Sequence, residues 1–263
     1  MTYFTSPLRM PGSHRTLYYD ILPANVTPSA SLVDILVVHG FAGTAQSDFA
    51  GLLPQLQERQ NIVAPELYGY GRSTHRTTYP TSYYGDDVED LKALLDQLKL
   101  SRVQVVAFSD GGIVGLLLAA RYPERIQALA VLGAQATLQE SDVSAIRHWL
   151  LERPLAEEWQ KELAKLHGDP YWRSLPEMYV RVQEELVAEG GELISKQELA
   201  NIQCPTLIMH GKRDRVVSVE YAYQLHKQIA GAELRLFEAG HAAHLRCAEE
   251  YTQAVKEFLR KHE

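Results

Sequence analysis

The chain has 263 residues, of which 46% are hydrophobic, and a formal net charge of −7. This length suits one α/β domain with an inserted segment, and the hydrophobic content is sufficient for a sizeable core. The acidic balance and the lack of a basic stripe argue against nucleic acid or an anionic membrane surface as a partner. No apolar run approaches the roughly 20 residues that a membrane-spanning helix needs.

The cysteines and the N-terminal residues bear on the compartment. Only two cysteines occur, Cys204 and Cys247. Residues 1–7 lack the basic and apolar regions of a secretory signal. We therefore expect a cytoplasmic protein in which both thiols are free.

Short apolar runs without clean alternation predict buried parallel strands. The strong runs are residues 34–38, 61–64, 103–108 and 205–209, and the weaker ones are 128–132 and 233–237. Helix-like segments, among them 86–98, 112–122 and 248–259, alternate with them along the chain. This order predicts an α/β fold with a mostly parallel sheet and helices on both faces, preceded by an antiparallel edge strand at 16–22.

The alternation is interrupted before the penultimate strand. Residues 135–198 contain only helix-like, charge-rich segments such as 156–166 and 177–188. We expect a core formed by residues 1–134 and 199–263, with residues 135–198 inserted as a small helical lid above the carboxyl ends of the strands. The chain's three tryptophans, Trp149, Trp159 and Trp172, lie in this insertion. They either attach its helices to the core or line an apolar pocket.

A serine directly follows the apolar run 103–108, in the sequence Ala107-Phe108-Ser109-Asp110-Gly111-Gly112. Small residues two positions before and after Ser109 favour a sharp strand-to-helix turn, which exposes the hydroxyl beside the positive end of the helix. The usual pattern is Gly-x-Ser-x-Gly, so Ala107 is a departure from it.

A serine nucleophile needs a base and a carboxylate that orients the base. Asp214 and His241 follow the strands at 205–209 and 233–237, which gives the chain order serine, acid, histidine. His244 is the rival base. The stretch 133–136, after another strand, contains no rival acid. A metal at His241 and His244 would need a further ligand cluster that the sequence lacks.

An oxyanion hole requires backbone N–H groups aimed at the reacting oxygen. Asp110, at the helix start, supplies one natural donor. Phe41, in the glycine-rich loop after the 34–38 strand, would supply the other. The alternative is that this loop is only a strand-to-helix connection.

These motifs together resemble the α/β-hydrolase superfamily over nearly the whole chain. They are His39-Gly40-Phe41, residues 69–73, 109–112, 121–125 and 211–214, and Gly240-His241. Glu66 stands where that family usually has a structural aspartate. The resemblance implies the α/β-hydrolase fold and a Ser109–His241–Asp214 triad, with no metal or cofactor.

A narrower resemblance is to the biphenyl hydrolase-like esterases, the valacyclovir hydrolase type. It rests on residues 43–49, 109–112, 133–136 and 241–246. In that group the aspartate after the nucleophile holds the ammonium of α-amino acid esters, which implies this role for Asp110. The alternative is that an acid in the first turn of a helix is stabilising by itself, by about 0.3–1 kcal/mol.

We expect a serine hydrolase that cleaves small carboxylic esters, α-amino acid esters among them, through an acyl-enzyme intermediate. A thioesterase, a lactonase and a C–C bond hydrolase could use the same triad, because a fold does not fix the substrate. A non-catalytic ligand-binding protein is a further alternative. The sequence leaves the oligomeric state open, a homo-oligomer included.

Overall fold

The computed structural model describes residues 4–10, 14–27 and 32–263. Its centre is an eight-stranded sheet in the order β1-β2-β4-β3-β5-β6-β7-β8. The first two strands are antiparallel to their neighbours, and the other pairings are parallel. The strands are β1 (Phe4–Arg9), β2 (Thr16–Leu22), β3 (Ile35–Val38), β4 (Ile62–Glu66), β5 (Val103–Phe108), β6 (Ile126–Leu132), β7 (Thr206–Gly211) and β8 (Glu233–Phe237). All the predicted strands are present, but β8 is an edge strand whose residues alternate between exposed and more buried positions, and the prediction that it is a buried strand is wrong.

The prediction that the strand at 16–22 lies at the sheet edge is wrong. β1 pairs with β2 from Phe4↔Ile21 to Arg9↔Thr16, and therefore forms the edge itself. The β1 sequence lacks an apolar period, because an edge strand has only one neighbour and little to bury. It also contains Pro7, which is tolerated where a backbone N–H is not needed by a second neighbour.

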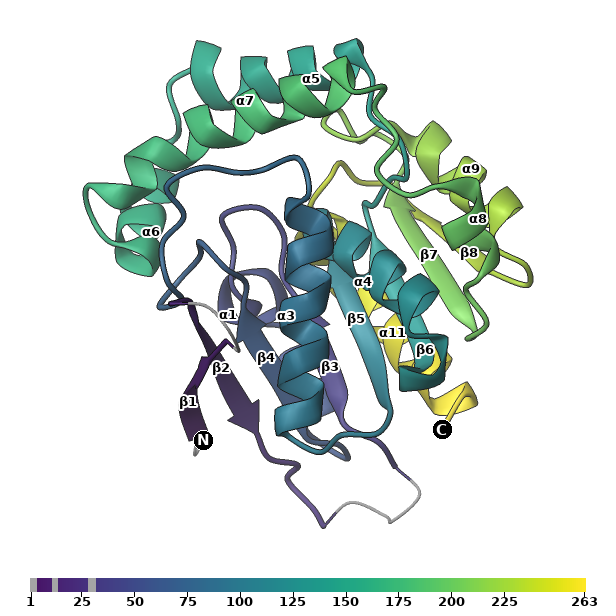
Figure 1. Cartoon of the computed structure of the whole chain (residues 1–263). Coiled ribbons are helices and arrows are strands. Elements are labelled where there is room, and N and C mark those ends of the chain that lie inside the picture. Colours follow the sequence, from purple (N-terminus) through teal and green to yellow (C-terminus); the bar gives the residue numbers. More distant parts are fainter. Residues whose placement is uncertain (1–3, 11–13, 28–31) are drawn as a thin grey trace.

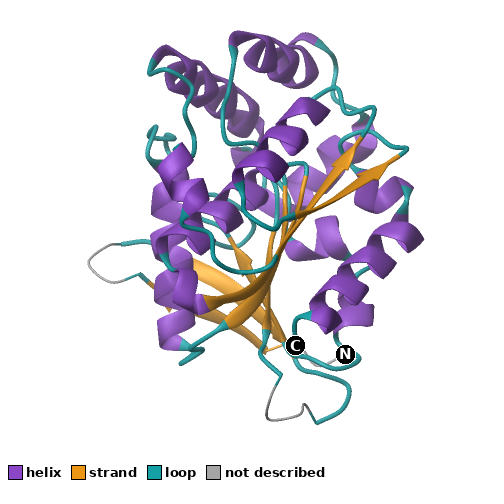
Figure 2. Cartoon of the chain, turned by 90° about the vertical axis from the view of Figure 1, so that its right-hand side faces the viewer, coloured by secondary structure: helices purple, strands orange, loops and turns teal. Residues whose placement is uncertain are grey.

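Helices cover both faces of the twisted sheet (Figures 1 and 2). Alternate residues of β3 explain how: Leu36 and Val38 face one apolar cluster, and Ile35 and Val37 face the other. The first cluster contains α3 (Tyr83–Gln97), α4 (Asp110–Arg121) and α9 (Val219–Gln228). The second contains α1 (Ala45–Phe49), α2 (Leu53–Leu56) and α11 (Ala248–Lys261). The predicted mostly parallel α/β architecture is thus confirmed.

Helices also fill the interval between β6 and β7. They are α5 (Glu140–Arg147), the π-helical turn η2 (His148–Glu152), α6 (Glu157–His167), the 3-10 turn η3 (Tyr171–Ser174) and α7 (Leu175–Ala188). We call residues 140–188 the inserted helices; α5, α6 and α7 lie across the carboxyl-end edge of the sheet (Figure 1). A further short helix, α8 (Lys196–Ala200), packs near α4 and α9 and spans the boundary expected at 198/199. The division into core and lid stays a prediction.

The order of the strands reverses its direction between β3 and β5. From β3 the chain moves to β4 on one side and then crosses to β5 on the other side. Loops that leave neighbouring parallel strands in opposite directions open a crevice at their carboxyl ends, which is where ligands bind in α/β sheets. Phe41 lies in the loop after β3, and Ser109 directly follows β5.

Helix α4 approaches β3 unusually closely at Gly111. A Cβ atom on Gly111 would lie 2.3 Å from the carbonyl oxygen of His39 and 2.4 Å from that of Val38. Only glycine fits this contact, because both neighbours are backbone atoms that cannot turn aside. The contact fixes the start of α4, and hence Ser109, against the end of β3.

No helix in the described ranges is long and apolar enough to cross a membrane. Cys204 and Cys247 are both free thiols.

Replacing Gly111 by alanine should strongly destabilise the protein, since the added methyl group overlaps with two carbonyl oxygens. We expect a loss of at least about 2 kcal/mol in the free energy of unfolding, measured by urea denaturation. Gly51→Ala is the matched control, because nothing lies within 4 Å of the position that its Cβ would occupy. It should change the unfolding free energy by less than about 0.5 kcal/mol. Equal destabilisation by the two variants would contradict the steric role of Gly111.

Candidate active site

Ser109 occupies the sharp turn between β5 and α4 that the sequence predicts. Its backbone has φ 53° and ψ −121°, a conformation that non-glycine residues rarely adopt. The surrounding structure maintains it: the Ser109 N–H donates to the Leu132 carbonyl at 2.8 Å, and the Ser109 carbonyl accepts from Gly112 at 2.8 Å. Strain that is held in this way is typical of functional positions.

The structure also explains why Ala107 is accepted in place of glycine. Ala107 is fully buried, and its methyl group faces Gly115 of α4. A Cβ on Gly115 would lie 3.2 Å from the Ala107 Cβ. The absent side chain of Gly115 therefore provides the space that the Ala107 methyl group occupies.

Ser109, His241 and Asp214 form one chain of hydrogen bonds. The Ser109 Oγ lies 2.9 Å from His241 Nε2, and His241 Nδ1 lies 2.7 Å from Asp214 Oδ2. Because the carboxylate can only accept, Nδ1 carries the proton, and Nε2 is left to accept from the serine hydroxyl. The three residues come from the ends of β5, β8 and β7, as the sequence predicts.

Asp214 is buried and held as a carboxylate by its donors. Its Oδ1 accepts from the N–H groups of Val216 and Val217 at 2.8 and 2.9 Å. The His210 Nε2 lies 3.2 Å from Oδ2. Burial by itself raises the pKa of Asp214, but the hydrogen bonds from His210, His241 and Val217 outweigh it, so the pKa falls well below 3.8. Asp214 thus stays ionised beside His241.

His244, the rival base, lies in a different environment. It is buried, and its ring packs on Phe108 with the ring centroids 4.3 Å apart. Burial lowers the pKa of His244 to about 4. The hydrogen bond from Ser109 goes to His241. Among the described residues no group of three or more His, Cys, Asp or Glu side chains is placed to hold a metal ion.

The loop that carries Phe41 is fixed by its own His39 and by Asp48 of α1. His39 Nδ1 lies 2.8 Å from the Gly40 carbonyl oxygen, and the Gly40 N–H donates to Asp48 Oδ2 at 2.8 Å. The Gly40 carbonyl and the Phe41 N–H belong to one peptide plane and point in opposite directions. The His39 contact therefore also sets the direction of the Phe41 N–H.

Phe41 and Asp110 line the same pocket as Ser109. No backbone hydrogen bond within the described residues engages the Phe41 N–H. Asp110 is the first residue of α4, where an N–H has no acceptor inside the helix. Both amides are thus free to bind a ligand oxygen.

The side chain of Asp110 is buried with one oxygen unpaired. Its Oδ1 accepts from the hydroxyls of Tyr84 and Tyr179 at 3.0 and 2.8 Å. Its Oδ2 has no hydrogen-bond partner among the described residues. Burial raises the pKa of Asp110 to about 6, although the two tyrosine hydroxyls oppose the shift. A buried acceptor without a partner is costly, and this oxygen is free to accept a hydrogen bond from a ligand.

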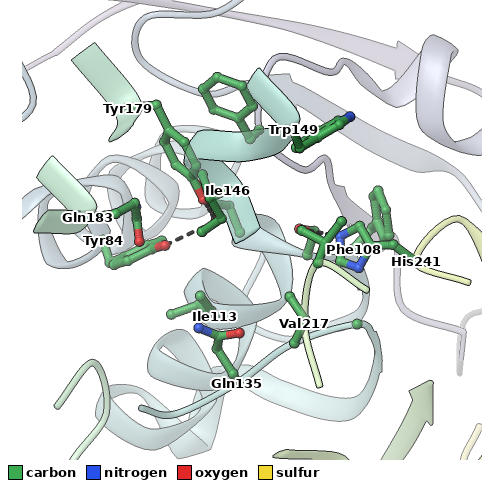
Figure 3. A pocket seen from close by; sticks show the side chains of 15 residues that line it. Tyr84, Phe108, Ile113, Gln135, Ile146, Trp149, Tyr179, Gln183, Val217 and His241 are labelled. Carbon is green, nitrogen blue, oxygen red and sulfur yellow. Dashed lines mark hydrogen bonds between the residues drawn. The ribbon is translucent and has the colours of Figure 1, made fainter. Parts of the chain in front are cut away.

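The pocket over Ser109 is mainly apolar, with a few polar groups (Figure 3). It encloses about 570 Å³ of empty space, including its mouth open to solvent. The inserted helices contribute four lining residues: Ile146, Trp149, Tyr179 and Gln183. An apolar lining with a few polar groups is typical of a site for a small molecule.

The tryptophans divide between the two expected roles. Trp149 lines the pocket and stacks on Trp159, with the ring centroids 5.2 Å apart. Trp172 is buried against the core and is only 5% exposed. One tryptophan therefore faces the pocket, and the others attach the inserted helices.

The sequence analysis missed the polar neighbours of Asp110. Tyr84 and Tyr179 lie on α3 and α7, far from the motifs that carry the resemblance. One signal was available: Tyr179, Gln183 and Leu186 share a helix face by their spacing, and Gln183 is a polar residue on that buried face. Gln135 was visible only as part of a motif, and its buried Oε1 also lacks a partner among the described residues.

Comparison with known proteins agrees with this fold. The model of the alpha/beta hydrolase fold family matches residues 35–246. Serine hydrolase BPHL of Mus musculus is 33% identical over 231 residues, which cover 86% of this chain and 78% of the mouse protein. The 2-hydroxy-6-oxo-2,4-heptadienoate hydrolase of Pseudomonas putida is 26% identical over 248 residues, covering 86% of this chain and 88% of that enzyme.

A solved structure is also similar over the full length. The 2-hydroxy-6-oxo-6-phenylhexa-2,4-dienoate hydrolase of Rhodococcus sp. superposes with a TM-score of 0.79 at 24% identity, covering 98% of this chain and 100% of that one. The similarity to Serine hydrolase BPHL of Mus musculus also confirms the resemblance to the biphenyl hydrolase-like esterases. By its matched family model and its fold, the chain belongs to the alpha/beta hydrolase fold family.

Proposed function

We propose that this serine hydrolase cleaves small carboxylic esters, with Ser109, His241 and Asp214 as its catalytic triad. The observation that carries the proposal is the unbroken hydrogen-bond chain from the serine hydroxyl to a buried carboxylate. A serine hydroxyl is a weak nucleophile without such a base, and packing alone does not require this alignment.

The reaction follows from the positions of the protons. His241 Nε2 accepts the Ser109 proton as Oγ attacks the ester carbonyl, and the resulting imidazolium is stabilised by Asp214. The Phe41 and Asp110 N–H groups bind the oxyanion of the tetrahedral intermediate. His241 then donates its proton to the leaving alcohol, which gives the acyl-enzyme. In the second half, His241 deprotonates a water molecule that attacks the acyl carbonyl, and the proton returns to Ser109 as the acid leaves.

We assign to residues 135–198 the role of a lid. Four of the residues that line the pocket come from its helices, and they are Ile146, Trp149, Tyr179 and Gln183. The position of these helices above the carboxyl ends of the strands (Figure 1) supports a role in excluding water from the acyl-enzyme.

Within the esters, the pocket favours substrates with an α-ammonium group. Asp110 supplies a buried carboxylate whose Oδ2 is unpaired, directly after the nucleophile in the chain. An ammonium that pairs with this oxygen would be held close to the reacting carbonyl, which reduces the entropic cost of reaction. The two tyrosine hydroxyls hold Oδ1 and thereby leave Oδ2 for the substrate.

C–C bond hydrolysis is the second candidate, because two of the similar proteins are named as dienoate hydrolases. Their named substrates are carboxylates. The described residues that line the pocket include no lysine or arginine, and the charged acid among them is Asp110. This electrostatic environment repels a carboxylate and attracts a cation, which favours the ester.

Ser109→Ala should abolish the turnover of p-nitrophenyl esters, with a loss of roughly 10³-fold or more in kcat, since the nucleophile is removed. A fluorophosphonate probe should label the wild-type protein at Ser109, as measured by mass spectrometry of the peptide. Ser101→Ala, which changes an exposed serine, is the control and should keep both properties. Full ester turnover by the Ser109 variant would overturn the triad, and a wild-type protein that binds small ligands without labelling would favour a binding protein.

Asp110→Asn should reduce activity selectively. The amide can still accept from the tyrosines, but it no longer carries the charge that pairs with an ammonium. We expect kcat/KM for an aminoacyl ester to fall by about 10–100-fold, the range of a charge-assisted hydrogen bond, and kcat/KM for the acyl ester without the amino group to change little. A matched pair of esters that differ only in this group measures the ratio. Equal losses on both esters would sink the ammonium role.

The preference for aminoacyl esters should depend on pH through Asp110. Since its pKa is about 6, the carboxylate is ionised above this pH and protonated below it. The substrate ammonium loses its proton at about pH 7.7–8.0. The ratio of kcat/KM for the aminoacyl and acyl esters should therefore be highest between these values and fall on both sides. Effects of pH that are common to the two esters cancel in this ratio. In Asp110→Asn the fall of this ratio at low pH should be absent. A fall that persists in the variant would contradict the role of Asp110.

A further inference from the structure

His167 connects the inserted helices to the loop that carries Phe41. It is the last residue of α6 and is 1% exposed. Its Nε2 lies 2.9 Å from the carbonyl oxygen of Ala42, and its Nδ1 lies 2.8 Å from the Gly71 nitrogen. It does not line the pocket. Its partners lie 125 and 96 residues away in sequence, so only the fold brings them together.

The two contacts define where the proton of His167 lies. The Gly71 N–H can only donate, so Nδ1 must accept from it. The proton of the neutral ring is therefore on Nε2 and is donated to the Ala42 carbonyl. Burial lowers the pKa of His167 below its ordinary value of 6.5, which is consistent with this neutral form.

The hydrogen bond from His167 to the Ala42 carbonyl acts on a tight turn of the Phe41 loop. Residues 40–43 form a tight turn in which the Gly43 N–H donates to the Gly40 carbonyl at 3.2 Å. Ala42, the third residue of the turn, has φ 53°. A positive φ at this position favours glycine, so Ala42 adopts it at a cost that its surroundings must offset. His167 is one of those surroundings.

Phe41 is thereby held from both sides. His39 fixes the peptide plane before it through the Gly40 carbonyl. His167 fixes the peptide after Ala42 through the Ala42 carbonyl. The first contact comes from the loop itself, whereas the second comes from α6. The two peptide planes that flank Phe41 and Ala42 are thus held by separate parts of the chain, one of which belongs to the inserted helices.

We propose that His167 is a positioning residue through which helix α6 aligns the Phe41 amide of the oxyanion hole. This inference rests on the proposed function, because an oxyanion must form at that amide for its alignment to matter. An amide shifted from its position stabilises the charged intermediate less, while the uncharged substrate binds almost as before. The effect therefore falls on kcat and not on KM.

Two conservative variants separate the contacts of His167. In His167→Gln the amide nitrogen lies as far along the side chain as Nε2, so it can still donate to the Ala42 carbonyl. In His167→Asn the amide oxygen lies as far along as Nδ1, so it can accept from Gly71 but cannot reach Ala42. His167→Ala removes both contacts. Because Asn and Gln are of similar polarity, a purely structural role would not favour Gln over Asn.

Tyr171 offers a matched control for the attachment of the inserted helices. Its hydroxyl accepts from the Arg76 N–H at 3.0 Å and donates to the Gly69 carbonyl at 2.8 Å. It therefore ties η3 to the same loop region as Gly71 but forms no hydrogen bond to residues 40–43. Tyr171→Phe should leave ester turnover and probe labelling unchanged.

The experiment measures kcat and KM on a p-nitrophenyl ester, the rate of Ser109 labelling by a fluorophosphonate, and the melting temperature of each variant. We expect His167→Ala and His167→Asn to lower kcat and the labelling rate by about 10–100-fold, somewhat less than the loss of an oxyanion donor. KM should stay within about threefold, since substrate binding does not use the amide charge. His167→Gln should recover most of both rates.

The outcomes that overturn the inference are distinct. If the probe labels the wild-type protein and labels His167→Ala at the same rate, this inference is wrong while the proposed function stands. The same follows if His167→Asn is as active as His167→Gln, or if the loss lies in KM. If His167→Ala does not fold, the comparison of the Asn and Gln variants at equal melting temperature decides. A wild-type protein that neither labels nor turns over esters overturns the proposed function, and this inference with it.

Discussion

The contact on which the site depends is the close approach of α4 to the end of β3. Gly111 allows the helix to start against two backbone carbonyls, where any side chain would collide. This proximity forces the turn at Ser109 into a positive φ and places the serine beside the loop that follows β3. Ser109, the N-terminus of α4 and the Phe41 loop are thus brought together by one packing constraint. The constraint is steric, so it persists without substrate.

Two buried carboxylates in this site behave in opposite ways because their donors differ. Asp214 is surrounded by two backbone N–H groups and two histidines, and its pKa is lowered despite burial. Asp110 receives two tyrosine hydroxyls on one oxygen only, and its pKa is raised. The number of hydrogen bonds to the charged form decides the sign of the shift. Asp214 is consequently suited to hold a histidine, whereas Asp110 has one oxygen without a partner among the described residues.

The inserted helices do more than cover the pocket. Tyr179 orients the Asp110 carboxylate, Trp149 forms part of the apolar wall, and His167 reaches the loop that carries Phe41. Tyr179, Trp149 and His167 all lie outside the motifs that carry the resemblance to the family. Variation in this segment can therefore change the wall of the pocket and the contacts of the Phe41 loop while the sheet stays the same.

Local patterns predicted much of the fold and of the site. The central strands were predictable because a fully buried strand is a continuous apolar run. Ser109, Asp214 and His241 were predictable because each lies in a turn or loop after a predicted strand, at the same edge of the sheet. The edge strand β1 was not, since an edge strand buries little and its sequence carries no period. The partners of Asp110 were not predictable either, because α3 and α7 meet it only through packing.

The sequence by itself therefore determined the order of strands and helices and the residue types at the ends of the strands. These depend on hydrophobic periodicity and turn chemistry, which act between near neighbours in the chain. The tertiary structure decided which histidine meets Ser109, which oxygen of Asp110 is left unpaired, and that His167 reaches Ala42 across 125 residues. Such contacts join segments that are remote in sequence. Their geometry is set by how the layers pack, which no local pattern encodes.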